Sequence, residues 1–291
     1  MDQPTTRKNA RIDVADVLRG LAVMGIIVLH SIEHFNFGSY PDTSAQSAWL
    51  NFTDKAIWDG LFFMFGGKAY AVFALLFGFS FFIQDNNQQM KGKDFRLRFC
   101  WRLVLLFLFG NLNASFFTAE VLVLYSLVGF ILVPTCRLSD KTILILACLL
   151  LIQPLPLYYT LRAAFDPTYT PLTIPTRELW MTTYQSQMNG TFLETLRTNL
   201  WEGQLASLAW AWDHGRVFQT AALFLLGMLA GRRRLFLQEA LPIWNKICAG
   251  AIIAFFPLYG INNLLPQFIE NRSILVPLSL IISHLPILLS C

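Results

Sequence analysis

Two basic residues in the first apolar segment are spaced to share one face of a helix. Arg19 and His30 are eleven residues apart, roughly 20° past three full turns and about 16 Å along the axis. Glu33 and His34 follow His30 by three and four residues, so they cluster at the same end of that face. A guanidinium at one end and a titratable imidazole at the other suit a protein that holds an anionic donor on one side of a membrane and reacts on the other.

These residues also have structural interpretations. Arg19 can anchor the helix at its inner end, paired with Asp16 one turn earlier, and His30 can mark the membrane interface. His30 and His34 have a spacing that two metal ligands could use, but no Cys, Asp or Glu in the chain completes a recognisable ligand set. We therefore expect no metal site.

Lys68 lies about ten residues from either end of a second apolar run, within Gly66-Gly67-Lys68-Ala69-Tyr70. A lysine at that depth must pair, snorkel or line a cavity. We expect Lys68 to bind a donor or to stabilise an oxyanion. The structural alternative is an ion pair with Asp59 or Glu120 that holds helices together.

Further polar residues gather where the chain turns between apolar runs. Glu120 is an acid–base candidate, or could orient His30, and Asp213 and His214 precede a later run. An outward-facing polar cavity would explain why such clusters recur on one side of the membrane. The polar turn before Glu120 contains Asn111, Asn113, Ser115 and Thr118.

The composition identifies the solvent in which these residues must work. The 291 residues are 55% hydrophobic and 14% charged, with a mean hydropathy of +0.50, 26 Phe and eight Trp. A soluble globule, collagen, a disordered chain and a free nucleic-acid-binding domain are therefore excluded. The net charge of +4 is too small to indicate a nucleic-acid partner. The five Cys lie in apolar runs or at their basic ends, so we expect no disulfide framework.

Eight apolar runs approach the length of a membrane span, and none alternates with period two, so the sequence predicts an all-α fold. We expect a polytopic transmembrane helix bundle of about eight spans, with residues 1–291 forming a single integral membrane domain. The fourth and sixth runs are short for a span. The runs are Val14 to Ile32, Trp58 to Ile83, Phe99 to Phe116, Val121 to Pro134, Thr142 to Tyr159, Val217 to Ala230, Ile247 to Leu265 and Ile274 to Cys291.

Basic residues predict the orientation. With the N-terminus in the cytoplasm, inner segments hold fifteen Lys and Arg and outer segments hold six. No small-residue cleavage motif follows the first run before Glu33, so we interpret it as an uncleaved span. We expect a multi-pass protein of a bacterial inner membrane.

The longest polar stretch, residues 161–216, lies outside under this orientation. Thr191 and Glu194 form a capping-box pattern before an amphipathic helix. Because Trp prefers the membrane interface, this helix is expected to lie there and to wall an outward-opening site, or only to cover the bundle. Its apolar stripe contains Phe192, Leu193, Leu196, Leu200, Trp201, Leu205, Leu208, Trp210 and Trp212.

Several of these segments resemble the YeiB-like family, also called the domain of unknown function 418 family. Asp16-Val17-Leu18-Arg19-Gly20-Leu21-Ala22 and Gly67-Lys68-Ala69-Tyr70 through Gly78 resemble its first two blocks. Arg102 through Gly110, Asn113, Glu120, Leu124-Tyr125 and Gly129 resemble its third. The chain carries Asn113 and Ala119-Glu120 where the family usually has His and Gly-Asp.

The resemblance implies an inner-membrane protein within a wider group of transmembrane acyltransferases. The spacing of Arg19 and His30 also resembles the first-span motif of the acyltransferase 3 family. The YeiB-like family extends further at its C-terminal side with additional spans, which predicts that this chain is truncated inside an apolar run.

We therefore expect a membrane-bound O- or N-acyltransferase that uses acyl-CoA, most simply acetyl-CoA, as donor. His30, assisted by Glu33 or Glu120, would remove the acceptor proton, and Arg19, Arg98 and Arg102 would hold the donor phosphates. Expected partners are membrane lipids, an envelope glycan or lipid acceptor and a second copy in a homodimer, without nucleic acid. The alternatives are a structural membrane protein and a transporter or exporter, the latter disfavoured because the sequence reveals no inverted repeat or paired broken helices.

Overall fold

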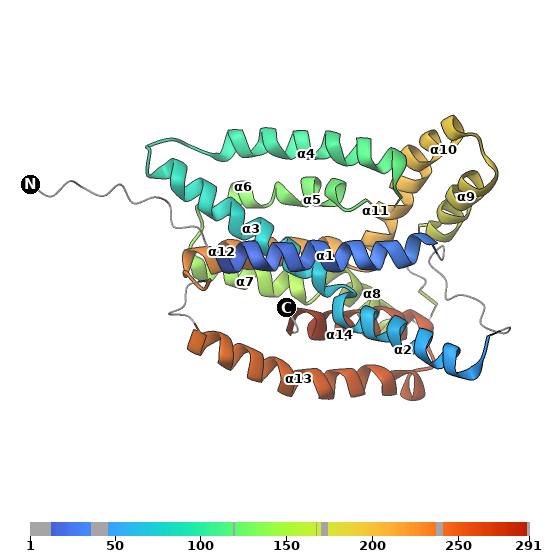
Figure 1. The fold of residues 1–291 in the computed structure, drawn as a ribbon. Helices are drawn as coiled ribbons and strands as arrows, with labels where there is room; N and C mark the ends of the chain where they lie inside the picture. The colour runs from blue at the N-terminus through green and yellow to red at the C-terminus, as the bar shows by residue number, and fades with distance from the viewer. Residues whose placement is uncertain are drawn as a thin grey trace, which may run out of the picture.

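The computed structural model describes residues 13–35, 46–118, 120–166, 168–169, 174–236 and 241–289, and every regular element in these ranges is helical (Figure 1). In the first half the helices are α1 (Asp13–Phe35), α2 (Ala48–Phe65), α3 (Lys68–Gln89), α4 (Arg96–Phe116), α5 (Leu122–Gly129), α6 (Leu132–Thr135) and α7 (Asp140–Leu151). In the second half they are α8 (Pro154–Phe165), α9 (Thr176–Asn189), α10 (Phe192–Thr198), the π-helical η1 (Asn199–Gly203), α11 (Gln204–Asp213), α12 (Arg216–Arg232), α13 (Leu241–Phe268) and α14 (Arg272–Leu289).

The predicted all-α fold is confirmed, but the number of candidate spans is smaller than eight. Within the described residues, four helical stretches are long and apolar enough to cross a membrane, or five if the bent pair α7–α8 is one span. Two of the remaining runs are helical but short, since a break divides α5 from α6 and α12 has 17 residues. The four stretches are Val14–Ile32, Ala48–Gln89, Arg96–Phe116 and Trp244–Phe268.

Besides the run divided between α5 and α6, two longer apolar runs that the sequence presents as continuous are broken. The run Trp58 to Ile83 is divided at Gly66-Gly67 into α2 and α3, and Gly67 has a φ of 72°. Because a side chain is strained in that left-handed conformation, glycine suits this position. The run Thr142 to Tyr159 bends by 48° between α7 and α8 at Gln153, whose φ is 58°. Helix breaks that the sequence did not reveal are therefore present.

The centre of the bundle is the contact between α3 and α12, which pack in parallel. Close to their starts, Tyr70 hydrogen-bonds Thr220. Further along, a Cβ added to Gly227 would overlap the carbonyl oxygen of Leu75, and one added to Gly78 would overlap that of Phe224. Small residues thus let the two backbones touch, as in membrane helix pairs generally.

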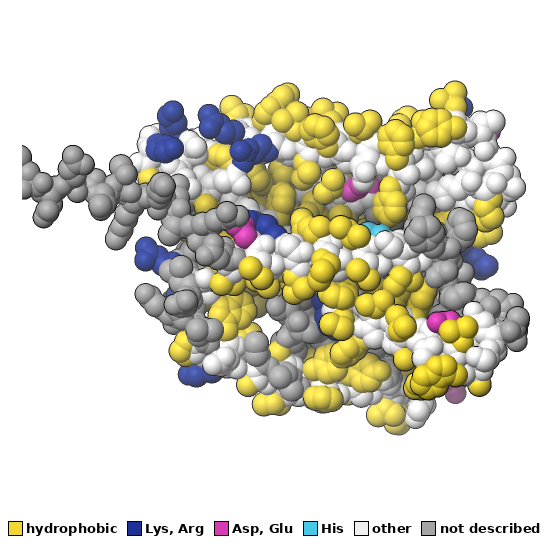
Figure 2. All heavy atoms as spheres, viewed as in Figure 1, with side chains coloured by type: hydrophobic (Ala, Val, Ile, Leu, Met, Phe, Trp, Pro, Cys, Tyr) yellow, Lys and Arg dark blue, Asp and Glu magenta, His cyan; other side chains and the backbone are white. Residues whose placement is uncertain are grey.

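Side-chain types separate along the long axis of the molecule. Figure 2 shows most of the visible Lys and Arg side chains at the end that carries the α3–α4 turn, with hydrophobic side chains spread over the flanks of α1, α2 and α4. At that end Arg232 of α12 donates to the carbonyl oxygens of Leu138 and Cys136 at 2.8 and 2.5 Å and pairs with Asp140 at 3.1 Å. This end, called the basic end below, is thereby tied to the start of α7. Helices α9 to α11 gather at the opposite end (Figure 1), which is called the aromatic end below after Trp201, Trp210 and Trp212 of this segment.

Candidate functional site

His30 and Glu120 lie within electrostatic range of each other at the aromatic end of the bundle. Glu120, in the turn between α4 and α5, is 6% exposed, and Asn113 of α4 donates a hydrogen bond to its Oε2. The backbone N–H of Leu122 donates to Oε1 at 2.6 Å. The ring of His30 lies edge-on to Phe117 at 5.2 Å, and His30 interacts electrostatically with Glu120. The structure therefore brings together the imidazole and the carboxylate that the sequence singled out.

Burial has the largest effect on the pKa of the Glu120 carboxyl group. It raises the pKa of the carboxyl above its usual value, while hydrogen bonds from the Leu122 and Val121 backbone and the charge of His30 oppose the rise. A carboxyl tuned in this direction stays closer to proton exchange at neutral pH than an exposed glutamate. Such a group beside an imidazole can hold or orient a proton.

The raised pKa of Glu120 predicts a pH dependence of stability. The folded state holds the proton more tightly than the unfolded state, so stability is fully present below the unfolded pKa and falls as pH rises through the folded pKa. We expect Glu120→Gln to remove this decline, because the amide keeps an oxygen for the Asn113 donor without ionising. Melting temperature in detergent measured across the acidic range tests this, with Glu178→Gln on the exposed face of α9 as control. An equally steep decline in Glu120→Gln and wild type would contradict the assignment.

A helical stretch at the aromatic end packs against the polar turn that precedes Glu120. The predicted capping box is confirmed: Thr191 and Glu194 exchange hydrogen bonds at the start of α10. From there α10, η1 and α11 form a continuous helical stretch that exposes Phe192, Leu193 and Trp201. Its position at a membrane interface stays a prediction.

The π-helical turn of this stretch faces the polar turn. Asn199 donates to the carbonyl oxygen of Ser115 at 3.0 Å, and a Cβ on Gly203 would lie 3.2 Å from Thr118. No periodicity in the sequence predicted this turn. π-Helical turns often occur at functional sites because they redirect side chains and backbone groups.

The sequence suggested that Lys68 lies in the middle of an uninterrupted span, but the structure places it next to a helix break. It is the first residue of α3, after the Gly66-Gly67 break. Its ammonium donates to the carbonyl oxygen of Phe63 in the last turn of α2 and lies 4.2 Å from the Phe63 ring centroid. A cation at a helix C-terminus satisfies carbonyls that have no helical partner. Lys68 therefore joins α2 to α3, and Asp59, the partner considered above, pairs with Lys55 at 2.8 Å.

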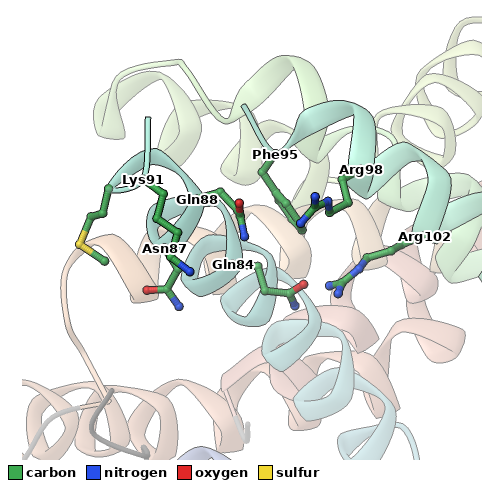
Figure 3. Close-up of a pocket in the computed structure, with 8 residues that line it drawn as sticks. Gln84, Asn87, Gln88, Lys91, Phe95, Arg98 and Arg102 are labelled. Carbon is green, nitrogen blue, oxygen red and sulfur yellow. The ribbon is translucent and has the colours of Figure 1, made fainter. Parts of the chain in front are cut away.

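The basic end contains a cavity of about 260 Å³, called the cationic cavity below, between the end of α3 and the start of α4 (Figure 3). Arg98 and Arg102 extend from α4 towards α3, and the amide of Gln84 points towards Arg102 (Figure 3). The guanidinium of Arg102 also lies 5.6 Å from the Phe95 ring centroid. The lining residues are Gln84, Asn87, Gln88, Met90, Lys91, Phe95, Arg98 and Arg102.

This cavity has the chemistry of an anion site. Three cations, Lys91, Arg98 and Arg102, surround it together with three side-chain amides. Guanidinium groups bind phosphate through paired hydrogen bonds. The sequence identified Arg98 and Arg102 but not Lys91, although the polar run from Gln84 to Lys91 was a usable signal.

Arg19 lies outside the lining of the cationic cavity. Its Nη1 pairs with Asp16 at 2.9 Å and its Nη2 donates to Ser80 of α3 at 2.5 Å. These contacts match the anchoring interpretation of Arg19. Glu33 belongs to α1 by its backbone, and its side chain and that of His34 lie outside the described residues.

Comparisons with known proteins identify bacterial relatives. The chain is 36% identical over 154 residues to "Uncharacterized protein YxaH" of Bacillus subtilis (strain 168), which is 50% of this chain and 37% of that protein. It is 26% identical over 142 residues to "Uncharacterized 39.9 kDa protein in amylase 3'region" of Bacillus acidopullulyticus, 49% of this chain and 39% of that protein. The matched region thus spans less than half the length of either relative. No family model matches the chain, and no solved structure matches it. With its helices, these similarities identify a multi-pass helical membrane protein candidate with bacterial relatives.

Proposed function

We propose that the protein is a transmembrane acyltransferase of a bacterial inner membrane. It would pass an acyl group, most simply acetyl, from cytoplasmic acyl-CoA to a hydroxyl or amine of an envelope glycan or lipid. One observation carries this proposal: α4 bears the cationic cavity at its start, through Arg98 and Arg102, and reaches the His30–Glu120 site at its end, through Asn113. The helical rise from Arg102 to Asn113 is about 16 Å.

The geometry suits donor binding at the basic end and acyl transfer at the aromatic end. Phosphates of the donor occupy the cationic cavity, and the pantetheine arm extends along the bundle towards the aromatic end. This orientation requires the basic end to face the cytoplasm, which the distribution of Lys and Arg supports. A role of Lys68 in donor binding or oxyanion stabilisation stays a prediction, and its ammonium donates to the Phe63 carbonyl oxygen in this structure.

The proposed reaction is general-base-assisted attack on a thioester. His30 accepts the proton of the acceptor hydroxyl or amine as its oxygen or nitrogen bonds to the thioester carbonyl carbon. The carbon–sulfur bond then breaks, and the departing thiolate takes the proton from the imidazolium. Glu120 stabilises the imidazolium between these steps, as a carboxylate does beside a catalytic histidine.

Calorimetric titration of acetyl-CoA into the purified chain tests the donor site. We expect Arg98→Gln/Arg102→Gln to weaken binding at least tenfold, since each hydrogen bond to a charged group contributes about 1.5–3 kcal/mol. Lys141→Gln, an exposed lysine at the basic end outside the cavity lining, is the matched control and should bind like wild type.

Two outcomes of that titration would contradict the donor assignment. One is equal binding by the double variant and the wild type. The other is no heat of binding to the wild type at concentrations where detergent alone is silent. Either result leaves transport as the better explanation of the polar groups.

A transporter of a small molecule or lipid, without covalent chemistry, is the second candidate. The observation that favours it is the pair of helix breaks, at Gly66-Gly67 and at Gln153. Interrupted helices expose backbone groups that bind substrates in many transporters. Uptake of a labelled small molecule or lipid into proteoliposomes would favour this candidate if His30→Ala leaves the uptake unchanged and no acyl product forms.

A further inference from the structure

A half-buried arginine lies between two aromatic rings at the aromatic end. Arg216, the first residue of α12, lies with its guanidinium carbon 5.3 Å from the Tyr70 ring centroid and 5.7 Å from that of Trp210. Its Nη1 donates to Oε1 of Gln219 at 2.9 Å. Among the residues that the structure describes, no carboxylate forms an ion pair with it. A half-buried guanidinium with only neutral neighbours is costly, which makes it a candidate for function.

Two buried amides next to Arg216 have hydrogen-bonding groups that nothing described satisfies. Gln219 is 0% exposed, and its Nε2 has no partner within the described part of the chain. Gln153 is also 0% exposed, and both its amide atoms lack partners there. A Cβ added to Gly215 would overlap Oε1 of Gln153, so this amide lies directly against the residue before Arg216. Buried unpaired amides are rare because each costs about 1–3 kcal/mol.

The backbone positions these amides with some strain. Gln153 has a φ of 58° at the bend between α7 and α8, a conformation that side chains rarely adopt. Nearby, Tyr125 donates to the Tyr70 carbonyl oxygen at 2.9 Å, and Tyr70 hydrogen-bonds Thr220. The walls around the guanidinium are therefore fixed by hydrogen bonds while the two amides remain available.

We propose that Arg216, Gln219 and Gln153 form a binding site for the carboxylate group of a small organic ligand. A carboxylate would supply the missing counter-charge, match the fork of the guanidinium and accept from the amide N–H groups. The Tyr70 and Trp210 rings would contact the apolar part of the ligand. Trp210, which is 40% exposed, would form the outer edge of this site at the aromatic end.

The charge count selects a carboxylate over a phosphate. One guanidinium with neutral amides matches the single charge of a carboxylate, whereas the cationic cavity offers three cations. The site is separate from the His30–Glu120 pair and does not depend on acyl transfer. The chain would then have a cationic cavity at the basic end and a carboxylate site at the aromatic end.

Thermal stability of the purified chain in detergent, titrated with benzoate, tests this site. We expect benzoate to raise the melting temperature of the wild type in a saturable manner. Benzamide, its neutral analogue, should have no such effect. Arg216→Gln should shift the half-maximal benzoate concentration at least tenfold. Arg177→Gln, an exposed arginine at the start of α9, is the matched control and should respond like wild type.

A second variant guards against loss of folding in Arg216→Gln. Gln219→Glu places a carboxylate within hydrogen-bond distance of the Arg216 guanidinium and so fills the site from within. It should remain folded and lose the response to benzoate. The proposal is overturned if benzoate has no effect on the wild type, if Gln219→Glu responds like wild type, or if inorganic phosphate stabilises the protein and benzoate does not.

Discussion

Gly227→Leu is expected to reduce the stability of the folded protein by about 3 kcal/mol or more, at the upper end of overpacking effects. At Gly227 even a single added carbon overlaps the Leu75 carbonyl oxygen, which is backbone and cannot rotate away. The strain would have to move α12 away from α3, at the contact that forms the centre of the bundle. Melting temperature and the yield of monodisperse protein in detergent measure the effect.

The matched control for Gly227 lies in another helix. Gly260→Ala in α13 adds a carbon where no heavy atom lies within 4 Å. It should leave stability unchanged or raise it by about 0.5–1 kcal/mol, because alanine favours a helix over glycine. A Gly227 variant as stable as Gly260→Ala would show that the close α3–α12 approach is not needed.

His30→Ala is expected to lower acyl transfer by a factor of about 10² to 10⁴, the contribution of a positioned general base. The loss should appear in the rate of transfer, while the affinity for acetyl-CoA stays within twofold of wild type, because the donor phosphates bind at the basic end. Transfer of radiolabelled acetyl to an added envelope glycan or lipid fraction, alongside calorimetry, separates the two quantities.

Ser31→Ala is the control for His30. Ser31 is the next residue of α1, is exposed and bonds only to its own helix, through the Ile27 carbonyl oxygen at 2.8 Å. We expect it to transfer acyl groups at the wild-type rate. If acetyl transfer is measurable in wild type and undiminished in His30→Ala, His30 is not the base.

The helices were predictable because the formation of each helix depends on local properties of the sequence. A run of apolar residues of suitable length must satisfy its backbone internally, so the region around α4 could only be helical. The capping box at Thr191 was equally local, since it needs two side chains three residues apart. The number of spans was not predictable in this way. The breaks at Gly67 and Gln153 depend on left-handed backbone conformations within apolar runs, and Gln153 packs against Gly215 of a distant part of the chain.

The candidate site was predictable in part for the same reason. Arg98 and Arg102 were identified because they share one end of a single helix. The sequence left Arg19 between donor binding and anchoring, and it contained no information that Ser80 of another helix would accept from it. Sequence spacing relates residues on one helix, whereas assignment to a cavity needs the packing between helices.

The site around Arg216 shows the same limit. The sequence places Gln153 and Gln219 in different apolar runs, more than sixty residues apart. Gln219 reaches the Arg216 guanidinium from three residues along the same helix, whereas only the packing of α7 and α8 against α12 brings Gln153 against Gly215, the residue before Arg216. Residues of this kind carry no motif that could be recognised in one sequence.

The π-helical turn η1 has a consequence for how the chain tolerates changes in length. A π-turn contains one more residue per hydrogen-bonded loop than an α-turn, so η1 corresponds to a single-residue insertion in an otherwise regular helix. Deleting one residue between Asn199 and Gly203 would restore α-geometry, because four residues at about 100° each turn the chain about as far as five residues of the wider π-turn. Trp210 would then keep its place beside Arg216, whereas a deletion in the regular part of α11 before Trp210 would turn that side chain by about 100°. Single-residue deletions within η1 should therefore disturb the aromatic end less than deletions elsewhere in this stretch.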